Sequence, residues 1–358
     1  MRMRKMLLLF AALALVMSLG LGVAGCADEE QDQEDGLPSM VVIATTGLGS
    51  SAHGWSSVLG DAFTAETGVK VRLLPQSTDI ARYTVLKDGD ADLICASGVN
   101  GWAPTMGILE FEEWGPQPIY IVWQGSVLAT GLAVRGDSDI YTGADLPGRT
   151  ISNVPGMPSI NLGRDHHLRT LGLTADDMVL VDFPSYPSVM EGLKLGTVEV
   201  IGAVSCTSSG MYDVASAPCG LRWIEMPHDN EEAWTAASKI APYVPNVVTK
   251  AAGIDPETDE PKELAGILNN TYCYGTELVS EELAYQWAKT IHTRLEDYQD
   301  RHPSLPGFTL EQALSFKYSP YPYHPGTIKY FKEIGAWTDQ HQEWQDRILT
   351  EMEERLAS

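Results

Sequence analysis

Short apolar runs that end in glycine- and hydroxyl-rich turns recur in both halves of this 358-residue chain. The first run, 40–44, is apolar throughout, as in strands buried on both faces of a sheet. The turn 45–51 follows it, and a helical pattern continues to Gly68, a residue type that favours helix ends. Two more strand patterns, 69–74 and 91–96, are separated by a second helical pattern. Strands that alternate with helices predict βαβ units and a largely parallel sheet.

A second series with the same layout begins after the long apolar stretch 120–134. Its strand patterns fall at 149–154, 178–183 and 198–204, with helical patterns at 159–171 and 187–195. Further helices are predicted over 281–300 and 338–356, and a returning strand within 263–277. Two such series in one chain predict an α/β protein with two lobes, each a mainly parallel sheet flanked by helices.

The N-terminus has the pattern of an export signal. Three cations within the first five residues precede an apolar run over 6–17, which is short for a membrane span. Val-Ala-Gly then stands directly before Cys26 and resembles the bacterial lipobox, in which the cysteine is lipidated and becomes the mature N-terminus. We therefore predict a signal peptide over 1–25 and an exported, membrane-anchored lipoprotein. An ordinary cleaved signal beside a chance cysteine is the alternative.

The charge of the chain excludes several classes of protein. A run of acids follows Cys26, so 26–39 is predicted to be a disordered tether. The formal net charge of −24 and the lack of a basic cluster exclude nucleic acid as a partner. No other apolar run approaches the roughly 18–20 residues of a membrane-spanning helix.

Known catalytic and cofactor motifs are missing from the sequence. There is no G-x-S-x-G or H-E-x-x-H pattern, and nothing selects a catalytic pair among acids such as Asp182 and Glu191. The segment 47–52 fits G-x-G-x-x-A, but the acidic residue that a dinucleotide site needs after the second strand is absent. His166 and His167 diverge by about 100° on a helix, so we predict a surface pair. We expect no cofactor, metal or catalytic residue.

Four cysteines follow Cys26, and export would allow them to form disulfides. Cys206 and Cys219 are close in sequence, which leaves open whether they form a disulfide or stay free. Cys95 and Cys273 lie in apolar, strand-like runs and are predicted to be small buried side chains.

The turns at the strand ends form the candidate binding site. Open α/β sheets bind ligands at the carboxyl ends of their strands, where glycine allows close approach and the first N–H groups of helices lack internal partners. Four such turns, two in each half, are rich in hydroxyl residues, although each alone could be only a helix cap. We expect them to hold a carboxylate or another polar solute. The candidate ligand-binding residues are Thr45, Thr46, Gly47, Gly49, Ser50, Ser51, Gln76, Ser77, Thr78, Ser97, Gly156, Ser159, Tyr186 and Ser205.

The segment 321–337, with the sequence YPYHPGTIKYFKEIGAW, resembles the C-terminal signature of the TAXI family, the solute receptors of a subclass of TRAP transporters. Shorter segments at 45–51, 89–93, 145–149 and 190–196 are similar to the same family. The resemblance implies a type II periplasmic binding protein fold, whose two lobes are joined by crossing strands and close around a solute. The partner it implies is a membrane transporter driven by an ion gradient.

The resemblance also divides the chain. Lobe I would comprise 40–133 and 272–337, lobe II would comprise 134–271, and 338–358 would be a C-terminal helix. Family solutes tend to be carboxylates or amino acids.

That solute class directs attention to three cations near the predicted turns, Arg82, Arg149 and Arg164. Each could pair with a carboxylate or form a surface salt bridge. Tyr186 is either a lobe II contact or a core aromatic, and His324 shapes a helix start or contacts the solute.

The sequence therefore predicts an extracytoplasmic, lipid-anchored receptor that captures a small carboxylate or amino-acid-like solute for a TRAP-type transporter. The same fold also serves ABC importers and membrane sensors, and an exported enzyme is the third alternative. Two segments, 53–55 and 155–159, depart from the family pattern, so amino-acid specificity is not carried over.

Overall fold

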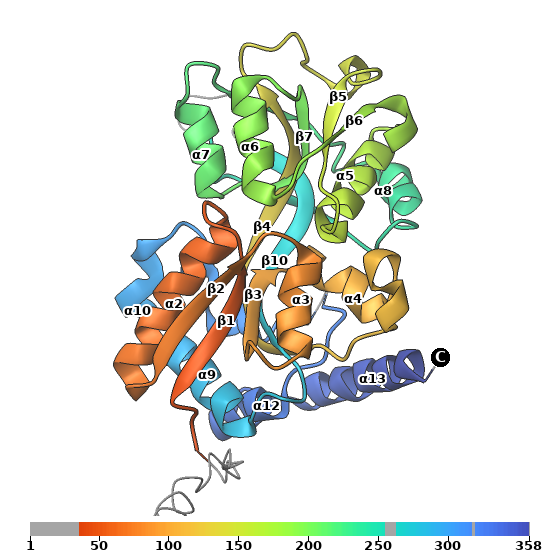
Figure 1. Cartoon of the computed structure of the whole chain (residues 1–358). Helices are drawn as coiled ribbons and strands as arrows, with labels where there is room; N and C mark the ends of the chain where they lie inside the picture. The colour runs from red at the N-terminus through yellow and green to blue at the C-terminus, as the bar shows by residue number, and fades with distance from the viewer. Residues whose placement is uncertain (1–35, 255–262, 317–318, 358) are drawn as a thin grey trace, which may run out of the picture. The chain divides into compact units, whose positions relative to one another are not determined.

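Ten strands of the described residues form one mixed sheet (Figure 1). The computed structural model describes residues 36–254, 263–316 and 319–357; the predicted signal peptide, Cys26 and most of the tether lie outside these ranges. The strands are β1 Met40–Thr46, β2 Lys70–Gln76, β3 Leu93–Ser97, β4 Tyr120–Arg135, β5 Thr150–Asn153, β6 Val179–Asp182, β7 Val200–Ser205, β8 Leu221–Ile224, β9 Pro245–Val248 and β10 Leu264–Gly275. Their order is β2-β1-β3-β10-β4-β7-β5-β6, with β8 paired to β4 and β9 to β10.

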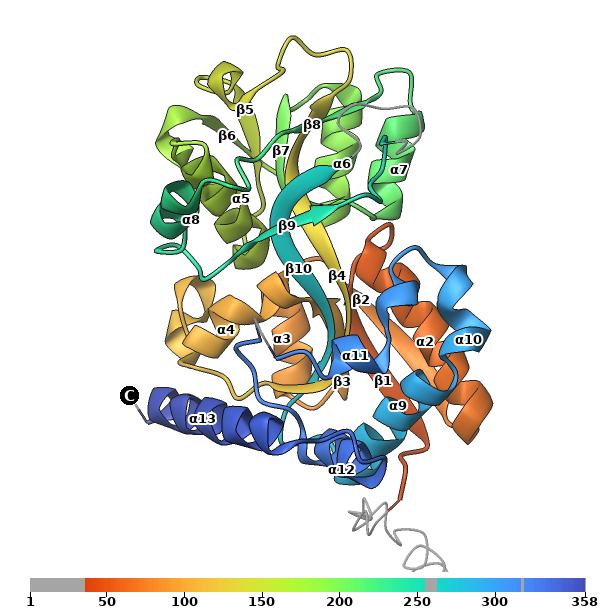
Figure 2. The same cartoon turned by 180° about the vertical axis from the view of Figure 1, so that it is seen from behind.

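Helices pack against this sheet in both lobes of the molecule (Figures 1 and 2). The α-helices are α2 Ser51–Thr67, α3 Asp79–Lys87, α4 Trp102–Met106, α5 Pro158–Thr170, α6 Tyr186–Leu195, α7 Ser209–Ser216, α8 Glu231–Ala237, α9 Glu281–Thr293, α10 Leu295–Tyr298, α11 Leu310–Ala313, α12 Pro325–Glu333 and α13 Asp339–Leu356. None of those within the described ranges is both long and apolar enough to cross a bilayer.

Lobe I is built on the parallel strands β1, β2 and β3, with β1 in the middle. The predicted order of strand, helix and strand is confirmed, since α2 and α3 connect these strands. Gly68 ends α2 with a φ of 76°, a left-handed conformation that glycine adopts without strain. Thr78 begins α3 by accepting the N–H of Ala81 at 3.2 Å. The predicted turns therefore act locally as helix caps.

Lobe II repeats this construction with β5, β6 and β7, which pair in parallel and carry α5 and α6. Pro158 occupies the first turn of α5, where its missing N–H costs nothing. Gly196 ends α6 with a φ of 75°. The elements α7, α8, β8 and β9 were not predicted, because their short segments carry no sustained hydrophobic period.

The strands β4 and β10 belong to both lobes (Figure 2). Their antiparallel pairing extends from Thr130 and Ile267 to Tyr120 and Gly275, while the other end of β4 pairs with β7 and β8. The sheet is thus mixed, with parallel pairs inside each lobe and antiparallel pairs where the lobes join. The predicted lobe bounds, 133/134 and 271/272, both fall inside these two strands.

The C-terminal segments pack on lobe I. The predicted helix at 338–356 is confirmed as α13, and Thr338 caps it by accepting the N–H of His341. His324 caps α12 through Gly326 N–H and has its other ring nitrogen 3.0 Å from the carbonyl of Val279. Because His324 is buried among these helix contacts and does not line the cavity described below, its role here is to shape the start of α12.

The prediction that His166 and His167 form a surface pair is wrong. His166 and His167 are fully buried rather than exposed, because α5 lies between β7 and α8. The ring of His166 packs against the rings of Trp234 and Tyr243, and His167 Nε2 lies 2.9 Å from the carbonyl oxygen of Thr130. Burial lowers the pKa of His166 to about 3 and that of His167 to about 4.

The structure answers the question that the sequence left open about Cys206 and Cys219. Cys206 and Cys219 are both free thiols, and Cys206 Sγ instead lies 3.7 Å from the carbonyl oxygen of Lys250. They are held apart because Cys206 follows β7, whereas Cys219 precedes β8. The prediction that Cys95 and Cys273 are buried is confirmed, and their sulfur atoms lie 3.1 Å apart across β3 and β10.

Candidate functional site

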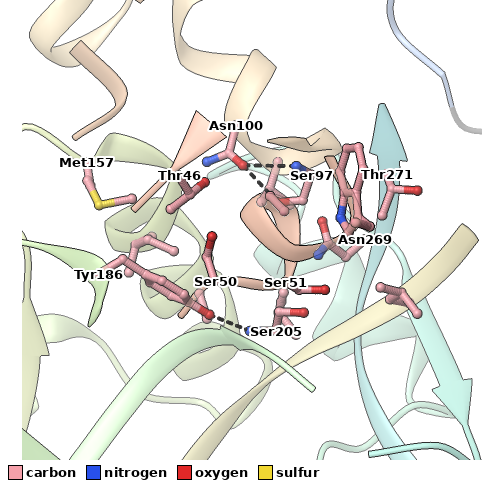
Figure 3. A pocket seen from close by; sticks show the side chains of 17 residues that line it. Thr46, Ser50, Ser51, Ser97, Asn100, Met157, Tyr186, Ser205, Asn269 and Thr271 are labelled. Atoms are coloured by element: carbon pink, nitrogen blue, oxygen red, sulfur yellow. Dashed lines mark hydrogen bonds between the residues drawn. The ribbon is translucent and has the colours of Figure 1, made fainter. Parts of the chain in front are cut away.

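A cavity lies between the lobes where the strand ends of both halves meet (Figure 3). It offers about 40 Å³ to the centres of water-sized groups. Since one water needs roughly 10–15 Å³ of such space, the cavity holds about three or four water-sized groups. The lining residues are Thr46, Ser50, Ser51, Ala52, Trp55, Ser97, Val99, Asn100, Leu128, Thr130, Met157, Ile160, Tyr186, Ala203, Ser205, Asn269 and Thr271.

The fold itself brings these residues together. The parallel strands β1, β3 and β7 end at Thr46, Ser97 and Ser205. The carboxyl ends of strands from both lobes therefore face one space. The crossing strands close the back of the cavity with Thr130 on β4 and Asn269 on β10. The predicted meeting of strand ends from both halves is therefore present.

Six of the fourteen candidate residues line the cavity, and binding by them stays a prediction. These six are Thr46, Ser50, Ser51, Ser97, Tyr186 and Ser205. Tyr186 is the first residue of α6, and its hydroxyl accepts the N–H of Ser205 at 2.9 Å (Figure 3). Tyr186 is thus both a buried aromatic and a wall of the cavity.

The other eight candidates lie outside the cavity. Most of them take part in contacts between the lobes or in caps: the carbonyl of Gly49 accepts from Gly210 N–H and Ser209 Oγ, and that of Gly156 accepts from the N–H groups of Asp79 and Ile80. The residues outside are Thr45, Gly47, Gly49, Gln76, Ser77, Thr78, Gly156 and Ser159. Among them, backbone groups of Gly49, Gly156 and Ser159 hold one lobe against the other.

The sequence analysis missed eleven lining residues. They are Ala52, Trp55, Val99, Asn100, Leu128, Thr130, Met157, Ile160, Ala203, Asn269 and Thr271. The crossing-strand residues among them carry a signal, because Thr130, Asn269 and Thr271 are polar residues within largely apolar strands. Asn269 and Thr271 alternate along β10 with Asn270 and Tyr272, which line a second cavity of about 230 Å³ instead.

None of the 17 described residues around the first cavity carries a charge at neutral pH. Tyr186 is its one ionisable side chain, and burial raises the pKa of this phenol to about 12. The site is therefore electrically neutral but polar, with apolar walls from residues such as Trp55, Leu128 and Met157.

The three cations proposed for a carboxylate do not reach the cavity lining. Arg82 is fully buried and pairs with Asp79, and Arg164 pairs with Asp165 at 2.8 Å. Arg149 pairs with Asp139 and Glu199, each at 2.9 Å. Each of the three guanidinium groups thus pairs with a protein carboxylate, while Nε and Nη1 of the buried Arg82 have no hydrogen-bond partner among the described residues.

The N-terminus of α5 is also already occupied. Pro158 has no N–H, and the N–H of Ser159 donates to Asp79 Oδ2 at 2.9 Å. A single helix N-terminus stabilises an anion by about 0.3–1 kcal/mol, whereas removing a carboxylate from water costs several kcal/mol. The N-terminus of α2, at Ser51 and Ala52, is accordingly too weak on its own to offset the burial of an anion.

Three buried polar atoms in the lining have no hydrogen-bond partner in the protein. They are Ser205 Oγ, Thr130 Oγ1 and Asn269 Oδ1. Buried polar groups are normally satisfied, and an unmade hydrogen bond costs about 1–3 kcal/mol. Their gathering around one space indicates that something else completes them. Within the described ranges, no group of three or more metal-binding side chains is present.

Comparisons with known proteins agree with this architecture. The NMT1-like family matches residues 43–335. A solved structure described as a periplasmic transporter is 12% identical, covers 87% of this chain and 97% of its own, and superposes with a TM-score of 0.51. No curated protein sequence matches the chain.

Two further solved structures match with lower TM-scores. A protein from Bordetella bronchiseptica RB50 is 14% identical with a TM-score of 0.48 and covers 84% of this chain and 81% of its own. An L-arginine-bound substrate-binding protein of an amino acid ABC transporter from Streptococcus pneumoniae is 14% identical with a TM-score of 0.45 and covers 75% and 93%. The family match spans most of the sequence, so this chain belongs to the NMT1-like family and has the two-lobed α/β fold of periplasmic solute-binding proteins.

Proposed function

We propose that this protein is an extracytoplasmic receptor that closes its two lobes around one small solute and delivers the solute to a membrane transporter. The observation that carries the proposal is the cavity itself. It lies between the lobes, both lobes and both crossing strands line it, and three of its buried polar atoms lack partners. A solute that completes these atoms would favour the closed arrangement over an open one.

Contacts between the lobes on two sides of the cavity support closure as the working motion. On one side Gly210 N–H donates to the carbonyl of Gly49 at 3.1 Å. On the other side Asp79 N–H donates to the carbonyl of Gly156 at 3.0 Å. These contacts join turns of different lobes, so opening of the lobes would break them, and the continuous strands β4 and β10 are suited to act as the hinge.

The partner we propose is the membrane component of a TRAP transporter, with lipid anchoring at Cys26. The support is the resemblance of segment 321–337 to the TAXI family and the lipobox-like sequence before Cys26. An ABC importer or a membrane sensor is the alternative partner for the same fold. Measurement of solute uptake into vesicles distinguishes a TRAP transporter from an ABC importer. A TRAP transporter needs an ion gradient, whereas an ABC importer needs ATP.

Native mass spectrometry of freshly purified protein tests the receptor function. We expect one small molecule bound per chain, released on denaturation. Ala52→Phe should abolish this binding, because the added ring would occupy the cavity at the start of α2. Ala357→Phe, at an exposed position after α13, is the matched control and should retain the solute. A folded Ala52→Phe variant that still carries the solute would contradict the proposed site.

A further inference from the structure

We infer that the solute is a small uncharged molecule with hydroxyl or amide groups, and not the carboxylate or amino acid that the sequence suggested. This inference rests on the proposed receptor function and assigns the chemistry of the same cavity. It follows from three properties of the site: its missing charges, its unpaired atoms and its size.

The first property is the charge around the cavity. A buried carboxylate needs a cation or several free N–H donors, and a zwitterion needs an acceptor of opposite sign as well. The lining contains no basic side chain (Lys, Arg or His) and no acidic side chain (Asp or Glu). Asp79 contacts the lining through Asn100, and its charge is paired with that of Arg82.

At the lobe II turn that precedes α5, the carboxylate of Asp79 takes the place that a solute anion would occupy. Asp79 Oδ2 accepts the Ser159 N–H, and Asn100 Nδ2 donates both to Asp79 Oδ1 and to Ser159 Oγ. A solute carboxylate at this turn would find the Ser159 N–H already donated to Asp79. Asn100 also uses its oxygen to accept from Ser97 Oγ at 2.8 Å. The Asn100 amide and the Ser159 N–H are therefore both used within the protein, and neither is left to hold an anion.

The second property is the set of atoms that remain unpaired. Ser205 and Thr130 offer hydroxyl groups, which both donate and accept, and Asn269 offers its amide oxygen as an acceptor. An O–H or amide N–H on the solute satisfies Asn269, and a neighbouring oxygen or hydroxyl satisfies the other two. A carboxylate group itself has no hydrogen to give to Asn269, so it cannot replace the amide N–H there.

The third property is the small size of the closed cavity, with about 40 Å³ for the centres of water-sized groups. Such a space suits a short polyol or a simple hydroxy-amide. Apolar contacts from Trp55, Met157 and Ile160 would cover its carbon atoms.

Isothermal titration with glycolamide and with glycolate tests the inference, because these probes have the same shape and differ in charge. Glycerol serves as the polyol probe. We expect glycolamide or glycerol to bind at least tenfold more tightly than glycolate. The solute recovered from denatured, freshly purified protein should likewise be uncharged at neutral pH.

Matched variants tie the binding to the proposed atoms. Thr130→Val keeps the side-chain shape and removes the hydroxyl, and Ser205→Ala removes the other; each should weaken binding of the uncharged probe by about tenfold to a hundredfold. Thr350→Val and Ser238→Ala remove hydroxyls that are exposed on helical segments far from the cavity, and should leave the affinity unchanged.

The outcomes distinguish the two proposals. Glycolate binding as tightly as glycolamide, with loss in Thr130→Val, would overturn the uncharged class while the receptor function stands. A recovered carboxylate or amino acid would do the same. If neither probe binds and no small molecule is recovered, the receptor function fails together with this inference.

Discussion

The carboxylate of Asp79 in lobe I accepts the backbone N–H of Ser159 in lobe II at 2.9 Å. The same carboxylate pairs with Arg82, and both side chains are fully buried. One acidic residue therefore closes the N-terminus of α5, neutralises a buried cation and joins the lobes beside the cavity. This arrangement explains why the turn with Gly156 and Ser159, predicted from the sequence to bind solute, has its Ser159 N–H already hydrogen-bonded within the protein.

Replacing Asp79 by Asn should destabilise the protein, because Arg82 would remain buried without a counter-ion. We expect the free energy of unfolding to fall by about 3–5 kcal/mol, measured by urea unfolding. The double variant Asp79→Asn with Arg82→Met should recover most of that loss, since it removes the buried charge as well. Asp88→Asn, at an exposed position after α3, is the control. Equal stability of Asp79→Asn and Asp88→Asn would refute the role assigned to the pair.

The contact between α5 and β7 allows a second test. Ala203, in the cavity wall, has a φ of 52°, which is unusual for a residue other than glycine. A Cβ at Gly163 would lie 2.6 Å from the Cβ of Ala203. Gly163→Ala should therefore push α5 away from β7, lower the free energy of unfolding by about 1–3 kcal/mol and weaken solute binding.

The double variant Gly163→Ala with Ala203→Gly should restore both properties, because it removes the clashing methyl and the left-handed alanine together. Thermal unfolding and calorimetric titration of the two variants provide the measurement. A single Gly163→Ala variant that behaves like the natural protein would show that α5 and β7 adjust freely.

The buried histidines predict acid sensitivity. Burial lowers the pKa of His166 to about 3 and of His167 to about 4, whereas an unfolded histidine titrates near 6.5. The unfolded state then binds more protons, so stability is full above pH 6.5 and falls as the pH drops toward 4. Each histidine can contribute a loss of up to about 3 kcal/mol across this window.

His166→Phe keeps an aromatic ring between Trp234 and Tyr243 but removes the titrating group. Its unfolding free energy, measured in urea at several pH values, should depend less steeply on pH than that of the natural protein. His228→Phe, at an exposed position, should leave the slope unchanged. An identical slope in His166→Phe would mean that His166 does not contribute.

The thiols of Cys95 and Cys273 face each other on paired strands at a sulfur–sulfur distance of 3.1 Å. We expect refolding with oxidised glutathione to join them: each thiol loses its hydrogen, and glutathione disulfide is reduced to two thiols. Native protein should react slowly, because both side chains are fully buried and burial raises the pKa of Cys95.

Peptide mapping by mass spectrometry checks this pairing, and Cys206 and Cys219 should remain open to alkylation in the unfolded protein. The bond should raise the free energy of unfolding by about 2–4 kcal/mol, an increase that Cys95→Ala would not show. Recovery of both Cys95 and Cys273 in alkylated form after oxidative refolding would contradict the prediction.

Local patterns were sufficient for most of the fold. The βαβ series, the end of α2 at Gly68, the cap at Thr78 and the final helix α13 all depend on residues close in sequence. The strand ends that meet at the cavity also followed, because parallel strands place their carboxyl ends at one edge. Such patterns could not reveal which backbone N–H and C=O groups are already hydrogen-bonded to segments far away in the sequence.

The order of residues along the chain was enough to predict the two α/β series, their turns and the meeting of Thr46, Ser97 and Ser205 at one cavity. The chemical character of that cavity depends instead on contacts between residues that are far apart in the sequence. The tertiary structure placed Asp79 on the N–H of Ser159, buried Arg82 and Arg164 in ion pairs, and brought Asn269 from β10 to the back wall. The reason is physical: hydrogen bonds and charge pairs between residues far apart in the chain depend on how the lobes close.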